Sequence, residues 1–161
     1  MTLQDTVQET REFTLSLENN RLIAIPTGDG MALAFFGDPS APVKCAMEVS
    51  GRIRNSSDLT LRMGLNSGPA YITKDINGHD NLAGDGINIA QRVMDCGDAG
   101  HILVSKRVAD DLSCFSGWSQ YLSDLGEVEV KHGKRIHIFN LSGTDFGNAD
   151  QPSKLVEQRK K

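Results

Sequence analysis

Residues 81–92, Asn-Leu-Ala-Gly-Asp-Gly-Ile-Asn-Ile-Ala-Gln-Arg, open a helix whose polar positions recur at steps of three and four residues. These positions are Asn88, Gln91, Arg92 and Asp95, and the residues on both flanks of this stripe are apolar. We therefore expect the helix to be mostly buried. Because an unpaired buried charge is costly, the sequence predicts a polar or anionic partner for Asn88 and Arg92.

Length and charge favour one domain. The chain has 161 residues, of which 39% are hydrophobic, and this is enough for a single core. We expect a domain over residues 1–142 and a polar, disordered tail over residues 143–161. The formal net charge is -4, and no basic stripe is interleaved with aromatic residues, so the sequence argues against a nucleic-acid surface.

Cysteine usage and the N-terminal composition predict a cytoplasmic protein. Cys45, Cys96 and Cys114 are odd in number and far apart, which is typical of free thiols in a reducing compartment. Residues 1–10 are polar and acidic, unlike a signal peptide, and no window of the sequence has the apolar length of a membrane span. The histidines are scattered, which argues against a histidine-bound metal.

The hydrophobic pattern predicts an α+β fold. An Asp-Gly turn between two apolar runs predicts a hairpin, and alternating residues near the C-terminus predict a last antiparallel pair. With the helices between them, these strands favour an antiparallel sheet that helices cover on one face. The expected elements are a helix over 3–18, the hairpin strands 22–25 and 31–36, a helix over 41–54, strands 59–66 and 70–73, a polar loop over 74–83, a strand over 101–104, a helix over 106–112 capped by Ser105, and strands 127–130 and 136–139.

Two Gly-Asp-Gly tripeptides each have two interpretations. Asp29 lies at the tip of the first hairpin, where it is either ordinary turn chemistry or a carboxylate ligand for Mg²⁺. Asp85 lies at the first turn of the helix quoted above, where capping of the free backbone N–H groups is the favoured interpretation. Asn88 and Arg92 form either a structural link or part of a cleft or subunit interface, and the narrow polar stripe favours the second.

Three motifs together resemble the catalytic domain of class III adenylate and guanylate cyclases. Their order and spacing match that family from about residue 22 to residue 141. The motifs are Pro-Thr-Gly-Asp-Gly-Met-Ala-Leu-Ala-Phe-Phe at 26–36, Leu-Arg-Met-Gly-Leu-Asn-Ser-Gly-Pro at 61–69 and Gly-Asp-Gly-Ile-Asn-Ile-Ala-Gln-Arg at 84–92. The resemblance implies a ferredoxin-like sheet and a homodimer with active sites at its interface, where ATP or GTP becomes the 3',5'-cyclic nucleotide and pyrophosphate is released.

The resemblance also implies roles for single residues. Asp29 matches one of two aspartates that bind a pair of Mg²⁺ or Mn²⁺ ions. Arg92 matches the residue that stabilises charge developing on the α-phosphate, a role suited to a guanidinium. Asn88 matches the residue that orients the ribose, and Lys131 matches a triphosphate-binding lysine.

The chain departs from the family pattern in two places. The family's domain begins with a strand that carries the other metal aspartate, and the chain shows no such stretch, so we expect a domain truncated at its N-terminus. At the two base-reading positions the chain has Ile25 and Asn81. An isoleucine offers a purine no hydrogen bond, whereas an asparagine both donates and accepts. The choice between ATP and GTP therefore stays open.

Two hypotheses about function follow from the resemblance. The first is a purine nucleotide cyclase that works as a cytoplasmic homodimer. The second is a degenerate, non-catalytic module that binds a nucleotide or dimerises and so regulates a partner. Ile25 and the missing aspartate favour the module, whereas the presence of Asp29, Asn88 and Arg92 favours the enzyme.

Overall fold

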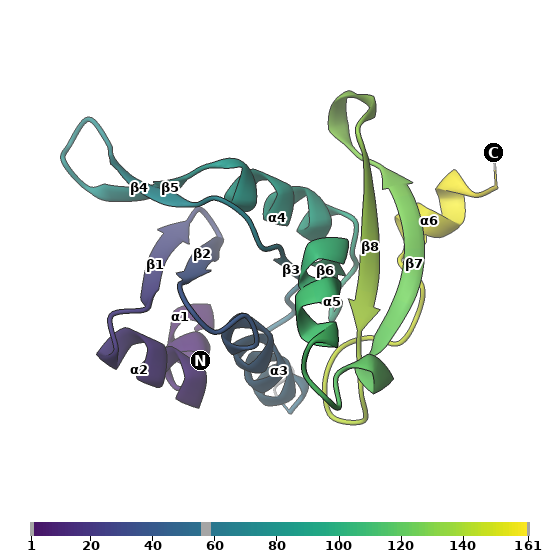
Figure 1. Cartoon of the computed structure of the whole chain (residues 1–161), viewed down its shortest axis with the longest axis horizontal. Coiled ribbons are helices and arrows are strands. Elements are labelled where there is room, and N and C mark those ends of the chain that lie inside the picture. The colour runs from purple at the N-terminus through teal and green to yellow at the C-terminus, as the bar shows by residue number, and fades with distance from the viewer. Residues whose placement is uncertain (1, 56–58, 161) are drawn as a thin grey trace.

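The computed structural model describes residues 2–55 and 59–160. The helices and strands alternate irregularly along the chain, and Figure 1 labels them. The helices are α1 (Leu3–Gln8), α2 (Arg11–Glu18), α3 (Ala41–Arg54), α4 (Asp85–Asp95), α5 (Lys106–Ser113) and α6 (Ser153–Gln158). The strands are β1 (Leu22–Thr27), β2 (Gly30–Phe35), β3 (Met63–Leu65), β4 (Tyr71–Lys74), β5 (Asp80–Ala83), β6 (Ile102–Ser105), β7 (Leu122–Glu129) and β8 (Arg135–Leu141). Two 3₁₀ turns are η1 (Ser119–Tyr121) and η2 (Lys131–Gly133).

The strands form one central sheet and two separate hairpins. The central sheet has the order β3-β6-β8-β7, in which β3 and β6 are parallel and the other neighbours are antiparallel. The hairpin β1–β2 packs on α2 and α3, apart from the central sheet, and the hairpin β4–β5 projects from the molecule as an arm that leads into α4 (Figure 1). The predicted first hairpin and the last antiparallel pair are both confirmed.

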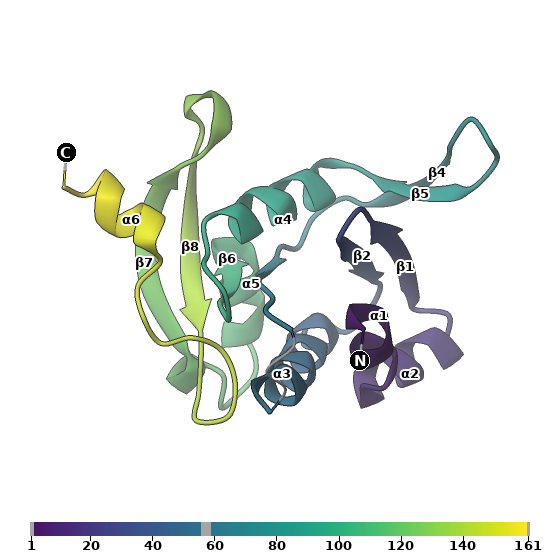
Figure 2. The same cartoon turned by 180° about the vertical axis from the view of Figure 1, so that it is seen from behind.

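Helices cover both faces of the central sheet, as Figures 1 and 2 show from opposite sides. On β6, Ile102 and Val104 pack with α3 and α5, whereas Leu103 between them packs with α4 and α6. The α+β class is confirmed, but the expectation of helices on one face and of a purely antiparallel sheet is wrong. Helices cover both faces because β6 is buried at every position and therefore needs cover on each side.

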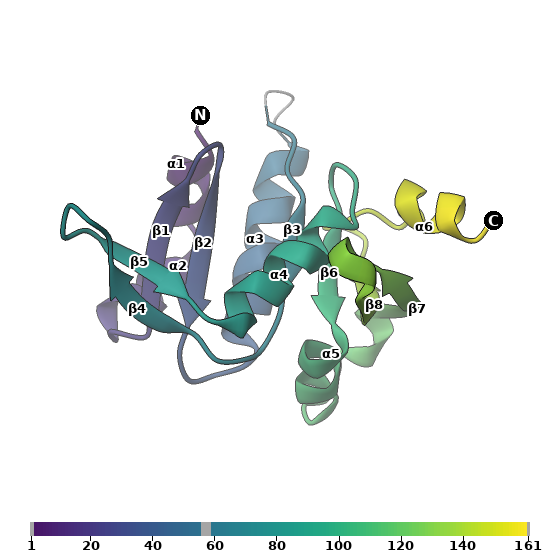
Figure 3. The same ribbon diagram turned by 90° about the horizontal axis from the view of Figure 1, so that it is seen from above.

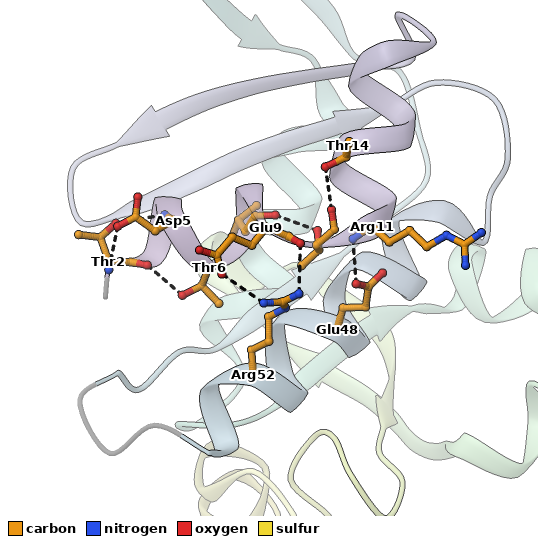
Figure 4. Close-up of polar contacts among 10 residues, drawn as sticks. Thr2, Asp5, Thr6, Glu9, Arg11, Thr14, Glu48 and Arg52 are labelled. Atoms are coloured by element: carbon orange, nitrogen blue, oxygen red, sulfur yellow. Dashed lines mark hydrogen bonds and ion pairs between the residues drawn. The ribbon is translucent and has the colours of Figure 1, made fainter.

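The two N-terminal helices are held against α3 by polar contacts (Figure 4). The carboxylate of Glu48 on α3 accepts hydrogen bonds from the backbone N–H groups of Arg11 and Glu12, at 2.9 and 3.3 Å. These N–H groups belong to the first turn of α2 and have no partner within the helix. Arg52 of α3 pairs with Glu9 at 3.2 Å, between α1 and α2. Glu9 is the C-terminal capping residue of α1 and Thr10 is the N-terminal capping residue of α2, so the predicted helix 3–18 is divided into two helices at this point.

Removal of the Glu48 carboxylate should destabilise this N-terminal part of the fold. We expect Glu48→Ala to lower the free energy of unfolding by about 1 kcal/mol, the usual cost of a lost N-terminal cap. Urea unfolding followed by circular dichroism measures this difference. Glu18→Ala is the matched control, because Glu18 lies exposed at the other end of α2. Equal stability of the two variants would contradict the capping role of Glu48.

The C-terminal segment differs from the predicted disordered tail. Beyond Leu141 the chain folds back, and residues 153–158 form α6 against the sheet (Figure 2). Phe146 and Leu155 are buried in the core on opposite faces of the sheet. Charged residues outnumber these two apolar anchors in the segment, so its sequence alone predicts a disordered tail. Among the residues that the structure describes, no helix is long and apolar enough to cross a membrane.

Candidate functional site

The start of α4 is shaped by glycines rather than by a side-chain cap. Gly84, with φ of +118°, is the residue before the helix, and the N–H of Gly86 donates to the carbonyl of Pro69 at 2.9 Å. A Cβ on Gly86 would lie 2.7 Å from that same carbonyl oxygen, so the close approach requires glycine. Asp85 accepts no capping hydrogen bond, so the prediction that Asp85 caps this helix is wrong. Asp85 instead lines the cavities described next.

Three of the predicted site residues line one cavity of about 340 Å³. Asn88 and Arg92 come from α4, one turn apart, and Lys131 comes from the turn between β7 and β8. His132 and Lys134 of the same turn also line it, so one wall of this cavity is strongly basic. Sequence reasoning missed these two residues, although the run Lys131–Arg135 is a visible basic cluster. The charges make the cavity suited to an anionic ligand.

A second cavity of about 540 Å³ continues along α4 toward the β4–β5 arm. Asp85 and Asn88 line both cavities, so the two adjoin. Tyr71 of β4 and Leu82 of β5 supply apolar surface to the second cavity. The two cavities together form a groove along α4, with the basic residues at the β7–β8 turn and with Tyr71 and Leu82 at the arm.

The exposure of α4 differs from the expectation of a mostly buried helix. Val93 is buried against Leu103 of the sheet, whereas Asn88 is exposed and Arg92 is half-buried. The apolar flanks predicted burial on both sides of the polar stripe, but Ile87 and Ala90 lie on a side wall of another cavity, between α4 and β2. Water therefore reaches both side chains, and the groove leaves Asn88 and Arg92 open to a ligand or to another chain.

Ile25 and Asn81 lie on neighbouring strands but outside the cavity that holds Asn88, Arg92 and Lys131. Ile25 is on β1, and Asn81 is on β5, which approaches β1. The amide oxygen of Asn81 accepts a hydrogen bond from the backbone N–H of Leu82 at 2.9 Å. The sequence predicts a polar loop over 74–83 and misses the strand β5, because Asp80 and Asn81 are unusual strand residues.

Asp29 lies apart from the basic cavity, at the tip of the β1–β2 hairpin. Within the described ranges 2–55 and 59–160, no group of three or more His, Cys, Asp or Glu side chains could hold a metal ion. A single carboxylate does not make a site for two Mg²⁺ ions, which need several oxygen ligands. The described residues of one chain therefore do not fit the pair of ions that the resemblance implies.

The C-terminal end of α4 is anchored by residues from distant parts of the chain. Arg62 lies 3.6 Å from the carboxylate of Asp95, and the ammonium of Lys154 donates to the Asp95 carbonyl at 2.6 Å. Asp98, just after the helix, accepts from the N–H and the hydroxyl of Ser153 at 2.9 and 2.8 Å. These contacts fix the end of the helix that carries Arg92.

The anchor at Asp98 predicts an acid-sensitive attachment of α6. The two hydrogen bonds from Ser153 hold the pKa of Asp98 below its ordinary value of 3.8. The stabilisation is therefore complete above the ordinary pKa and is lost as the pH falls through the lowered one. We expect the amides of α6 to exchange faster relative to those of β6 as the pH falls below about 4. Asp98→Ala should abolish this pH dependence. The control Asp111→Ala, on the opposite face of the sheet, should retain it. The same pH profile of amide exchange in both variants would contradict the role of Asp98.

Comparison with known proteins identifies one matching family model and several similar structures. The model of the adenylate and guanylate cyclase catalytic domain matches residues 40–143. A comparison with curated protein sequences finds no match.

The similar structures share the fold at low sequence identity. The guanylate cyclase domain of a protein from Catenaria anguillulae, in complex with GTP, is 22% identical with a TM-score of 0.67, and the match covers 88% of this chain and 82% of that one. An adenylyl cyclase from P. aeruginosa is 18% identical with a TM-score of 0.66, covering 90% and 83%. An adenylate/guanylate cyclase/hydrolase from Silicibacter pomeroyi is 25% identical with a TM-score of 0.62, covering 88% and 82%.

Proposed function

Because the chain belongs to the adenylate and guanylate cyclase catalytic domain family, we propose that it is a purine nucleotide cyclase domain acting as a homodimer. The substrate is ATP or GTP, and the product is the 3',5'-cyclic nucleotide. The observation that carries the proposal is the meeting of Asn88, Arg92 and Lys131 around one cavity. Two of these side chains are cationic, and a polyphosphate is an anion that fits such a basic cavity.

In the proposed complex, the nucleotide lies along the groove on α4. The β- and γ-phosphates lie at Lys131, and the α-phosphate lies at Arg92. Asn88, which lines both cavities, contacts the ribose between them. The base extends toward Leu82 and Tyr71, whose apolar surfaces accept a purine ring. Asn81 precedes Leu82 on β5 and Ile25 lies on the approaching strand β1, so in this arrangement both lie near the base end of the groove although neither lines a cavity.

The proposed reaction is an in-line displacement at the α-phosphorus. The ribose 3'-oxygen forms a bond to phosphorus, the bond to the bridging oxygen of the β-phosphate breaks, and pyrophosphate leaves. The hydroxyl proton passes to solvent. The Arg92 guanidinium stabilises the charge that develops on the α-phosphate oxygens. The family's use of Mg²⁺ or Mn²⁺ gives Asp29 a proposed role as ligand of one ion. Because Asp29 lies apart from the basic cavity of its own chain, its proposed place is in the active site that it shares with Asn88 and Arg92 of the other copy.

The proposed compartment is the cytoplasm. Cys45, Cys96 and Cys114 are all free thiols, which suits a reducing environment. Burial raises the pKa of the Cys45 thiol to about 11, so this sulfur stays protonated and packs as a small apolar group.

A second candidate function is the degenerate module that binds a nucleotide without turnover. The presence of the single carboxylate Asp29, without a group of three or more ligand side chains among the described residues, favours it. The chain, and a form extended at its N-terminus by the metal-carrying strand that the resemblance implies, should be incubated with Mn²⁺ and with ATP or GTP. Cyclic nucleotide and an equal amount of pyrophosphate from the extended form support the enzyme. Bound nucleotide without either product supports the module.

A further inference from the structure

The helix α6 contacts both of the elements that supply cations to the basic cavity. Arg92 belongs to α4, and Lys131 follows β7 in the turn to β8. The buried side chain of Leu155 on α6 packs in one cluster with Val93 of α4 and Val128 of β7. Figure 3 shows α6 next to β7, at the opposite end of the molecule from the β1–β2 hairpin. One apolar anchor therefore joins α6 to both elements.

The start of α6 is fixed on the C-terminal end of α4. The ammonium of Lys154 donates to the carbonyl of Asp95, and the N–H and hydroxyl of Ser153 donate to the carboxylate of Asp98. Asp95 lies less than one helical turn after Arg92. The position of α6 is therefore fixed relative to Arg92.

The end of α6 is fixed on β7, the edge strand of the central sheet. The N–H of Glu129, the last residue of β7, donates to the side-chain oxygen of Gln158 at 3.2 Å, and the side-chain nitrogen of Gln158 donates to the Glu129 carbonyl at 3.0 Å. The side chain of Gln158 thus pairs with backbone groups that a further strand would use. Arg159 donates to the carbonyl of Leu125, the residue that a bulge leaves out of the ladder with β8. Three hydrogen bonds therefore hold the end of α6 to β7.

The turn that carries Lys131 has little support from burial. Residues 131–135 are all exposed, and the N–H of Val130 donates to the carbonyl of Lys134 at 2.7 Å to close the turn. Glu129, which Gln158 holds, lies two residues before Lys131. The orientation of the turn therefore depends on the strand end from which it starts.

We propose that α6 is a brace that sets the position of Lys131 relative to Arg92, with Gln158 as its positioning residue. The inference rests on the proposed function, in which these two cations bind neighbouring phosphates of one polyphosphate. A ligand gains most from two cations that are already in place, because it does not have to order them on binding. The helix α6 lies after residue 143, where the match to the family's model ends, so the brace is a feature beyond that match.

Hydrogen exchange tests whether Gln158 holds the turn. Gln158→Leu keeps most of the length of the side chain and removes both hydrogen bonds to Glu129. The amide of Val130 should then exchange at least about threefold faster, because the turn opens more easily. Gln151→Leu makes the same change at an exposed position before α6 and should leave this rate unchanged. Equal rates in the two variants would overturn the proposal, whether or not the chain binds a nucleotide.

Titration calorimetry with inorganic triphosphate at low salt tests the effect on the cavity. The dissociation constant of Gln158→Leu should be at least about threefold higher than that of the parent, because the apparent affinity falls with the fraction of time that Lys131 spends in place. Gln151→Leu should bind like the parent, and thermal unfolding confirms that each variant is folded. Faster exchange at Val130 with an unchanged affinity would limit α6 to covering the sheet edge and would overturn its role in positioning.

A double substitution shows whether Gln158 acts through Lys131. Lys131→Ala alone should weaken triphosphate binding, and Gln158→Leu added to it should cause no further loss. The same further loss with and without Lys131 would overturn the proposal, because Gln158 would then act by another route. A parent chain that binds no triphosphate would contradict the proposed function and the positioning role that rests on it. Exchange at Val130 would then show separately whether α6 holds the turn.

Discussion

Arg92→Ala should lower the rate of cyclic nucleotide formation by about 100-fold or more, the usual effect of removing a donor that stabilises transition-state charge. Arg92 lines the basic cavity together with Asn88 and Lys131, and it is half-buried at the wall of the groove. The guanidinium is needed most when charge builds on the α-phosphate, so the turnover number should fall more than the affinity for substrate. The assay is chromatographic measurement of cyclic nucleotide in the N-terminally extended form of the domain.

The control for this experiment is a second arginine substitution. Arg107 lies exposed on α5 and lines neither cavity of the groove, so Arg107→Ala should retain the parent turnover. Arg92→Lys separates charge from geometry, because an ammonium keeps the charge but loses the planar fork. An unchanged turnover number in Arg92→Ala would contradict the proposed role of Arg92.

Gly64→Ala should have the largest effect on stability. Gly64 of β3 lies directly under α4, and a Cβ there would be 2.3 Å from the backbone nitrogen of Met94 and 2.5 Å from the carbonyl oxygen of Ala90. Both atoms are backbone, so the helix itself has to move away from the sheet. Such overpacking costs about 1–3 kcal/mol and sometimes more. The movement also displaces Arg92, so nucleotide binding should weaken in parallel.

Gly51→Ala is the matched control for this prediction. A Cβ on Gly51, within α3, would lie 3.6 Å from the carbonyl oxygen of Asp145, which is ordinary contact. Alanine is also the better helix former, by about 1 kcal/mol, so this variant should be at least as stable as the parent. Urea unfolding compares the two variants. A Gly64→Ala variant as stable as Gly51→Ala would show that α4 does not pack as closely on β3 as described.

Local patterns in the sequence predicted the local elements well. The Asp-Gly turn predicted the first hairpin, and Ser105 predicted the start of α5, where its hydroxyl accepts from the N–H of Val108. The elements that were missed depend on partners far along the chain. The strand β5 has a polar sequence and is held by β4, and the helix α6 is held by Asp98 and by the burial of Leu155.

In the candidate site, too, local sequence predicted some residues, whereas others depend on distant parts of the chain. The spacing of Asn88 and Arg92 placed them on one helix face, and the cavity includes both. The groove as a whole could not be predicted from local patterns, because it requires α4, the β4–β5 arm and the β7–β8 turn to meet. Only the family resemblance predicted Lys131 as a site residue. No sequence pattern predicted Tyr71 and Leu82, which line the second cavity because the β4–β5 arm folds beside α4.

The proposed homodimer forms active sites that combine Asp29 of one copy with Asn88 and Arg92 of the other. Mixing two inactive variants, Asp29→Ala and Arg92→Ala, in the extended form tests it most directly. Half of the dimers should then be mixed, each with one intact site, so the mixture should recover about a quarter of the parent's rate of cyclic nucleotide formation. A mixture as inactive as either variant alone, under conditions where the parent turns over and the subunits exchange, would contradict the shared site.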